Sequence, residues 1–163
     1  MKKLLIVTTC LALAACSSTK EGAELYGDSV NGGWAESVDV TNLNETPLTK
    51  AMRETGRDVV YFKLNESSVD ADARADLQKQ AEWLKAHPQA LVVIEGRCDE
   101  RGTREYNLAL GDKRANAARS YLIARGVEPN RIQTISYGKD KPVVLGSDEA
   151  AWAKNRSATT VAY

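Results

Sequence analysis

The sequence has few of the residues that carry metal or nucleophilic chemistry. Its 163 residues include one histidine, His87, and three cysteines. A zinc site usually takes four ligands, and His87 precedes Pro88 at an expected helix end, where capping is its ordinary role. A dyad of Cys98 and His87 would lack a third group to orient it. We therefore expect no metal ion and no cofactor.

Other catalytic arrangements are missing as well. Asp99 and Glu100 are neighbours in the chain, whereas the paired carboxylates of glycosidases flank the bond that they cleave. The pair Gly32-Gly33 follows no predicted strand, so it does not match a phosphate-binding loop. We expect a protein that is not an enzyme.

Neither sign of charge is in excess. The chain has 22 Lys and Arg residues and 22 Asp and Glu residues. Nucleic-acid-binding domains usually carry a basic surplus. We therefore expect no nucleic-acid partner.

The apolar run near the N-terminus, Leu4 to Ala15, is only about a dozen residues long, and a membrane-spanning helix needs roughly 20. Preceded by Lys2 and Lys3, it predicts a secretory signal peptide over residues 1–15. The end of this run, Leu13-Ala14-Ala15-Cys16, resembles the lipobox of bacterial lipoproteins, in which cleavage leaves an acylated cysteine at the N-terminus. The alternative is a plain cleavage site followed by a chance cysteine.

Acylation of Cys16 would anchor the chain to a membrane, because each buried methylene contributes about 0.8 kcal/mol. Ser17 follows Cys16, whereas lipoproteins kept in the inner membrane commonly have Asp there. The resemblance thus implies lipid anchoring in the outer membrane, facing the periplasm. Cys10 would leave with the signal peptide, so Cys98 would be the only free thiol, and no intramolecular disulfide is expected.

Residues 16–57 are predicted to be the lipidated N-terminus and a flexible tether. This segment is rich in small and polar residues and has no sustained apolar period, so it cannot bury enough surface to offset its ordering entropy. Trp34 is either a docking residue or incidental, and Leu48 to Met52 are expected to form a short helical turn.

The pattern changes at Asp58, where a folded domain is predicted to begin and to continue to Tyr163. Apolar runs and alternation predict strands over 58–64, 90–96, 131–138 and 157–163. Helical spacing predicts one helix that starts at Asp70 or Asp72 and ends at His87, another that ends near Arg125, and a short one over 149–154. The fold class is α/β, a mixed sheet covered by helices on one face, with the second strand in the centre.

Three segments, EGRCDERGTREYNLALGDKRANAARSYL, TISYGKDKP and DEAAWAKNR, resemble the OmpA-like peptidoglycan-binding domain over 58–163. The resemblance implies a βαβαβ-β fold that binds meso-diaminopimelate in the peptide stems of peptidoglycan. The binding aspartate of the family falls on Asp99 and its binding arginine on Arg114, and its Asn-x-x-Leu motif falls on Asn107 and Leu110.

The chain departs from the family pattern at four positions. The family usually has aspartate where this chain has Asn65, and a second arginine where it has Ser157. Arg97 and Cys98 also replace the usual residues. The departures at Asn65 and Ser157 concern accessory contacts at the rim of the site.

Diaminopimelate carries an ammonium and a carboxylate on one carbon, which one fixed anion and one fixed cation can recognise. Asp99 would accept from the ammonium, and the planar fork of Arg114 would hold the carboxylate through two parallel hydrogen bonds. Thr103 can cap the helix after the turn at Gly102. Apolar and backbone contacts are expected from Leu64, Asn65 and Leu110.

Two interpretations of the charged residues remain open. Asp99 and Arg114 could form only a structural ion pair with each other. The flanking charged residues are interpreted as a solvated rim; these are Glu100, Arg101, Arg104 and Glu105.

The resemblance also implies a protein partner, the periplasmic TolB, and a place in the Tol system that draws the outer membrane to the wall during division. The alternative is a lipoprotein of the same fold that serves as a docking module or wall anchor outside that system. The sequence between Cys16 and Arg57 does not decide between them.

The lipobox gives a direct test. We expect Cys16→Ser to abolish acylation and to leave the protein uncleaved or mislocalised, because the serine hydroxyl cannot take the thioether-linked lipid. Radiolabelled palmitate fed to cells measures this. Label in the variant, or none in the wild type, would contradict the lipoprotein interpretation.

Overall fold

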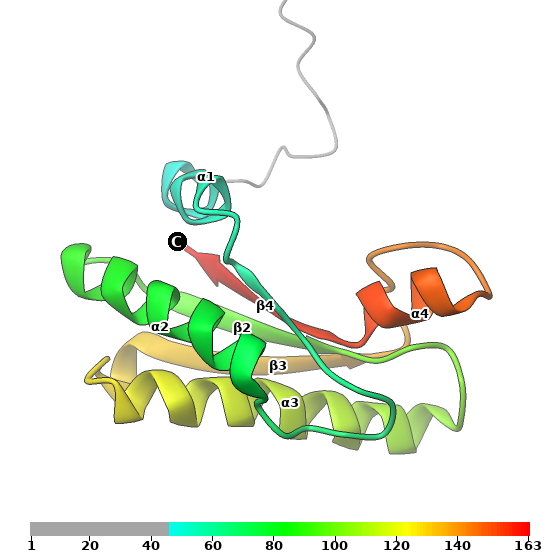
Figure 1. Cartoon of the computed structure of the whole chain (residues 1–163). Coiled ribbons are helices and arrows are strands. Elements are labelled where there is room, and N and C mark those ends of the chain that lie inside the picture. The colour runs from blue at the N-terminus through cyan, green and yellow to red at the C-terminus, as the bar shows by residue number, and fades with distance from the viewer. Residues whose placement is uncertain (1–45) are drawn as a thin grey trace, which may run out of the picture. The chain divides into compact units, whose positions relative to one another are not determined.

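The computed structural model describes residues 46–163. The predicted signal peptide, the predicted acylation site Cys16 and Trp34 lie outside the described residues. Within them, four strands form one mixed sheet, and helices α2 (Ala71–Ala86) and α3 (Arg104–Ala124) pack against one of its faces (Figure 1). The predicted fold class is confirmed.

The strands are β1 (Val59–Tyr61), β2 (Val92–Arg97), β3 (Ile132–Gly138) and β4 (Ser157–Ala162), in the spatial order β1-β4-β2-β3. β2 pairs in parallel with β3, and β4 pairs antiparallel with both β1 and β2. The strand predicted to be central, β2, is therefore internal to the sheet. Its alternating burial points its apolar side chains into the core.

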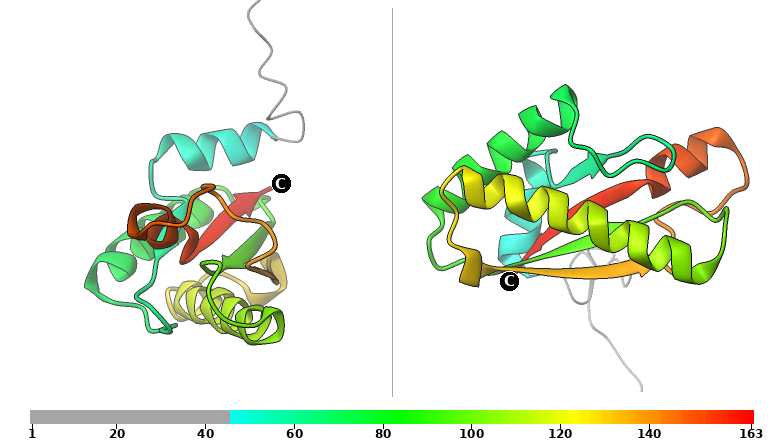
Figure 2. Two further views of the ribbon diagram at one scale, coloured as in Figure 1. Left: turned by 90° about the vertical axis from the view of Figure 1, so that its right-hand side faces the viewer. Right: turned by 90° about the horizontal axis from the view of Figure 1, so that it is seen from below.

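Helices α2 (Ala71–Ala86) and α3 (Arg104–Ala124) cover this core (Figure 2). The carboxylate of Asp70 accepts from the N–H of Ala73 and the hydroxyl of Thr103 accepts from the N–H of Tyr106, so each helix begins at a side-chain cap. A 3₁₀ turn over Pro129–Arg131 precedes β3, and the short helix α4 (Glu149–Asn155) precedes β4. None of the helices within residues 46–163 is long and apolar enough to cross a membrane.

Two glycines set how closely α3 approaches β2. A Cβ atom added to Gly96 would lie 1.9 Å from the carbonyl oxygen of Gly111, and one added to Gly111 would lie 2.4 Å from the hydroxyl of Ser136. Only glycine fits at position 96, on the strand side of this contact. The contact sets the position of the helix that carries Arg114 relative to the strand that leads to Asp99.

Residues before Asp58, within the predicted tether, also pack against the sheet. Helix α1 (Pro47–Glu54) is longer than the expected turn, and its Met52 is fully buried in the core. The hydroxyls of Thr46 and Thr49 both donate to the carbonyl of Ala162. Because β1 pairs with only the first three residues of β4, α1 covers the remaining edge, which would otherwise expose unpaired backbone groups.

The first strand is shorter than predicted. Phe62 is buried and its N–H donates to the carbonyl of Arg156, but Leu64 is half exposed. Asn65 has a left-handed φ of 57°, so the chain turns away from the sheet at this point. The alternation over 58–64 therefore reflects a strand only over its first part.

The glycine contact predicts a stability effect. We expect Gly96→Ala to lower the free energy of unfolding by about 1–3 kcal/mol, because the methyl group overlaps backbone that can move only with the whole helix. Urea unfolding measures this. Gly56→Ala is the control, since nothing lies within 4 Å of the added atom and only the cost of its positive φ remains. A Gly96→Ala loss no larger than that of Gly56→Ala would contradict the close packing.

Candidate ligand-binding site

The candidate site lies at the end of the molecule where three segments meet. The loop from β2 to α3, the segment after β1 and the helix α4 all lie at this end (Figures 1 and 2). A small cavity of about 10 Å³ opens between the first two. It is lined by Leu64, Asn65, Cys98, Asp99, Asn107, Leu110 and Arg114.

The structure thus brings together six of the seven residues that the sequence proposes for binding. The seventh, Thr103, caps α3 and is exposed. Asn107 is buried, and its amide donates to the carbonyls of Arg101 at 2.7 Å and Thr103 at 3.0 Å. Asn107 therefore shapes the loop that carries Asp99 in addition to lining the cavity.

Arg114 is fully buried, and its guanidinium is held by backbone carbonyls. Nε donates to Glu66 at 2.9 Å, Nη1 to Arg97 at 2.8 Å and Nη2 to Lys63 at 3.1 Å. Nη1 also makes a contact of 3.4 Å with the thiol of Cys98. Burial lowers the pKa of Arg114, although the nearby Cys98 and Asp99 oppose the shift.

These contacts limit how Arg114 can hold an anion. A guanidinium has five N–H groups, and four of those of Arg114 already have acceptors. One N–H of Nη2 has no acceptor among residues 46–163, and the N–H of Nη1 that meets the thiol makes only a weak hydrogen bond. The predicted two-bond grip on a carboxylate would have to use these two groups, and the thiol would have to give up its contact.

Asp99 is almost fully buried, and two arginines neutralise it. Arg101 donates from Nη2 at 2.7 Å and from Nε and its backbone N–H at 3.2 Å, and Nη1 of Arg156 lies at 3.5 Å. Burial alone would raise the pKa of Asp99, but the hydrogen bonds from Arg101 and Arg156 outweigh it and lower the pKa. Asp99 is therefore ionised at neutral pH.

The pairs found at Asp99 settle the first open question. Among residues 46–163, the ion pairs of Asp99 join it to Arg101 and Arg156, and Arg114 is not one of its partners. The structural ion pair between Asp99 and Arg114 is not formed. The two residues line one cavity as an anion and a cation that do not neutralise each other.

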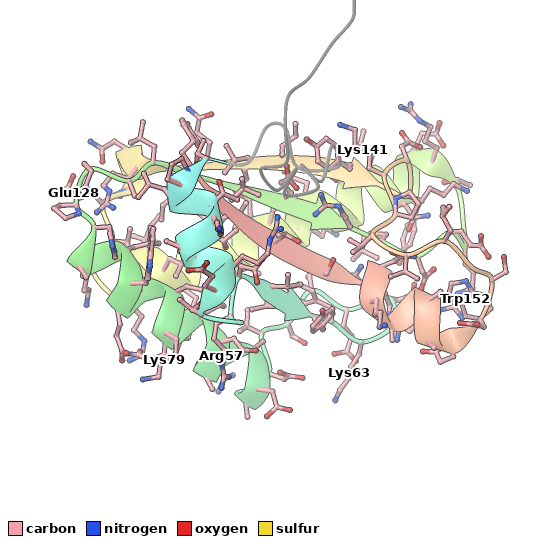
Figure 3. All side chains as sticks on the ribbon, turned by 90° about the horizontal axis from the view of Figure 1, so that it is seen from above. Arg57, Lys63, Lys79, Glu128, Lys141 and Trp152 are labelled. Carbon is pink, nitrogen blue, oxygen red and sulfur yellow. The ribbon has the colours of Figure 1, made fainter. Side chains whose placement is uncertain are left out.

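Arg101 lies at the partly exposed edge of the site, and it is paired there. Its guanidinium bonds to Asp99 and stacks over the ring of Trp152, 4.1 Å from the ring centre. Figure 3 shows Trp152 on α4, toward the same end of the molecule as Lys63. Arg104, by contrast, is exposed and pairs with Asp140 outside the cavity.

Arg156 is the second residue that the sequence did not assign to the site. It is buried, and it also donates to the carbonyl of Phe62 at 3.1 Å and to Glu149 at 2.7 Å. Its neighbour Asn155 holds the loop before α4 through bonds to Val143 and Val144. Arg156 is the last residue of the segment DEAAWAKNR, which resembles the family. The sequence did not indicate that its side chain reaches Asp99.

Leu64 and Asn65 form the opposite wall of the cavity. The carbonyls of Lys63 and Glu66, on either side of them, are two of the three carbonyls to which Arg114 donates. Asn65 replaces the usual aspartate at a position with positive φ, which asparagine tolerates better than most residues. The departure at Asn65 therefore keeps the turn but removes a negative charge from the wall.

Comparisons with known proteins are consistent with this arrangement. The model of the OmpA family matches residues 61–156. The peptidoglycan-associated lipoprotein of Rhizobium meliloti is 45% identical over 151 residues, which cover 93% of this chain and 81% of that protein. The lipoprotein of the same name from Haemophilus influenzae is 39% identical over 158 residues, which cover 97% of this chain and 95% of that protein.

Solved structures agree. The crystal structure of the peptidoglycan-associated lipoprotein from Burkholderia pseudomallei has a TM-score of 0.63 and 50% sequence identity, covering 65% of this chain and 90% of that chain. The C-terminal domain of Helicobacter pylori MotB has a TM-score of 0.61 at 19% identity, covering 65% and 84% respectively. The second similarity concerns the fold alone.

The buried thiol gives a test of the site's chemistry. Cys98 is 2% exposed, it donates to the carbonyl of Asn107 at 3.3 Å, and burial raises its pKa. We expect iodoacetamide at pH 8 to modify it slowly in the folded protein and rapidly in urea, because the thiolate is the reactive form. Mass spectrometry measures the modified fraction. Equally fast modification in both states would contradict an inert structural thiol.

Proposed function

The chain belongs to the OmpA family, as one of its peptidoglycan-associated lipoproteins, and from this premise we propose that it binds peptidoglycan non-covalently through diaminopimelate in the peptide stems. The observation that carries the proposal is the pair of unlike charges in one cavity. Asp99 and Arg114 both line it, and neither is the other's ion-pair partner. Such a pair can recognise a small zwitterion.

Diaminopimelate in a stem peptide offers an ammonium and a carboxylate at its free end. Asp99 accepts from the ammonium, and the carboxylate accepts from the Nη1 and Nη2 groups of Arg114 that no carbonyl uses. Leu64 and Leu110 contact the methylene chain, since both line the cavity. Charge-assisted bonds contribute roughly 1.5–3 kcal/mol each, and micromolar binding needs about 8 kcal/mol, so these apolar contacts supply part of the affinity.

The same chemistry selects the type of wall. A stem with lysine in place of diaminopimelate keeps the ammonium but has no carboxylate. A hydrogen atom of the lysine would then lie where the carboxylate was, and the free N–H groups of Arg114 would stay buried without an anion. Discrimination therefore depends on Arg114, and Asp99 serves both ligands.

Cys16 with its acyl chains anchors the protein in the outer membrane, facing the periplasm, in this proposal. The lipobox sequence and the membership in a family of lipoproteins support it. The wall-binding domain would then connect the outer membrane to the wall within the Tol system, with TolB as a further partner. The assignment of TolB follows from the family resemblance, and the alternative is an anchor that works outside that system.

Substitution of either charged residue should weaken binding. We expect Asp99→Asn and Arg114→Lys each to reduce binding to purified diaminopimelate-type peptidoglycan by tenfold or more, about 1.4 kcal/mol. Asparagine removes the charge that the ammonium needs, and lysine replaces a fork by a point charge. Co-sedimentation of the acyl-free protein with wall fragments measures this.

The choice of Arg114→Lys avoids a confounded result, because alanine would leave three buried carbonyls without their donor. Thermal unfolding confirms that each variant is folded. Glu100→Ala is the control, since Glu100 is exposed and is one residue from Asp99. Equal binding of the wild type to diaminopimelate-type and lysine-type walls would refute the zwitterion mechanism, whatever the variants did.

A further inference from the structure

Arg101 occupies the position that a ligand ammonium would need. Its Nε and Nη2 both donate to Asp99, and Arg156 takes a further share of that carboxylate. The cavity beside Asp99 has only about 10 Å³ of free volume, room for about one water molecule. A zwitterionic side chain can enter only if Arg101 or the wall of the cavity moves.

A second, larger cavity adjoins the first. Its volume is about 350 Å³, and it is lined by Leu64, Asn65, Arg101, Gly102 and Tyr106. Leu64 and Asn65 line both cavities. Arg101 thus stands between them, paired with a residue of the small cavity and lining the large one.

We propose that Arg101 exchanges partners when the stem peptide binds, leaving Asp99 to the ligand ammonium and binding a second carboxylate of the same stem in the adjoining cavity. This inference rests on the proposed function and extends it to a neighbouring group of the ligand. In peptidoglycan stems the D-glutamate that precedes diaminopimelate is linked through its side chain and carries a free α-carboxylate. That carboxylate is the chemical class that a released guanidinium would take.

The charges around Arg101 favour this exchange. Asp99 is the only carboxylate among the described residues to which Arg101 is shown hydrogen-bonded. Glu100 and Glu149 act on it through space, but Glu100 accepts from the indole of Trp152 and Glu149 accepts from Arg156. Once an ammonium takes Asp99, the guanidinium of Arg101 has lost its bonded anion.

The backbone around Arg101 can remain in place during the exchange. Its carbonyl is held by the amide of Asn107, and the carbonyls of its neighbours Glu100 and Gly102 are held by the ammonium of Lys139. Within residues 46–163, the side chain of Arg101, about one third exposed, is bound only by Asp99 and by stacking on Trp152. A rotation of the side chain is therefore sufficient, and the loop keeps its shape.

The exchange makes the two cavities act together. A bare zwitterion has to displace Arg101 from Asp99 and gains nothing from it afterwards. A stem with the second carboxylate displaces the same pair and then re-forms an ion pair with the released guanidinium. Arg101 would therefore penalise isolated diaminopimelate and favour diaminopimelate that is preceded by an acidic residue.

Two matched peptides and one substitution test this inference by calorimetry on the acyl-free protein. The peptides are L-Ala-γ-D-Glu-diaminopimelate and the same peptide with the α-carboxylate of D-glutamate amidated. They differ only in this second carboxylate. We expect the wild type to bind the acidic peptide at least threefold more tightly than the amidated one. We expect Arg101→Ala to weaken binding of the acidic peptide and to tighten binding of the amidated peptide, so that the preference disappears.

Arg104→Ala is the matched control, because Arg104 is a nearby exposed arginine that lines neither cavity. It should leave both affinities unchanged. A wild type that binds both peptides equally, or an Arg101→Ala variant that loses affinity for both by the same factor, would overturn the partner exchange while leaving the proposed function intact. Failure of the wild type to bind either peptide would overturn the proposed function and this inference together.

Discussion

The buried guanidinium of Arg114 is the constraint on which the site depends. Removing a charge from water is costly unless its donors are satisfied, and here three carbonyls from two separate segments accept from three of the five N–H groups of Arg114. The same bonds fix the end of β2 and the turn at Leu64 and Asn65, which are the two walls of the cavity. Carbonyl dipoles satisfy the N–H groups without cancelling the positive charge. The site therefore retains a cation that can still attract an anion.

Asp99, unlike Arg114, is bound to side chains of opposite charge. This difference determines how each of the two residues can bind a ligand. Its charge is neutralised by Arg101 and Arg156, whereas Arg114 has no bonded carboxylate among residues 46–163. A ligand carboxylate thus meets an unneutralised cation, but a ligand ammonium must compete for an anion that is already paired. Under the proposed function, a zwitterion would replace existing ion pairs at Asp99 and would add a new ion pair at Arg114. The cost of the exchange depends on which groups the ligand offers to the released arginine.

The sequence predicted the elements that local patterns determine and missed those that depend on distant contacts. Asp70 and Thr103 begin their helices as expected, because a cap acts over three residues. The packing of Met52 and the cover that α1 gives to β4 could not be predicted, since the gap that α1 fills arises only from the shortness of β1. Arg156 reaches Asp99 across 57 positions of the chain, and no local pattern contains that contact. Six of the seven proposed site residues line one cavity because the family motif preserves such distant relations.

A weak and exchangeable site is compatible with a lasting connection when the protein is already confined near its ligand. Under the proposed function, the acyl chains hold the molecule within reach of a polymer that repeats the same stem many times, so each rebinding event is effectively intramolecular. Tight binding to a single stem then adds little to the connection with the wall. Discrimination between different stems still decides which wall is bound. The pair between Arg101 and Asp99 lowers affinity for any bare zwitterion and thus acts against the wrong ligands more than against the right one. In that proposal, the charge asymmetry set by Arg114 serves selection at this site, while attachment strength would come from the lipid anchor and the repetition of the wall.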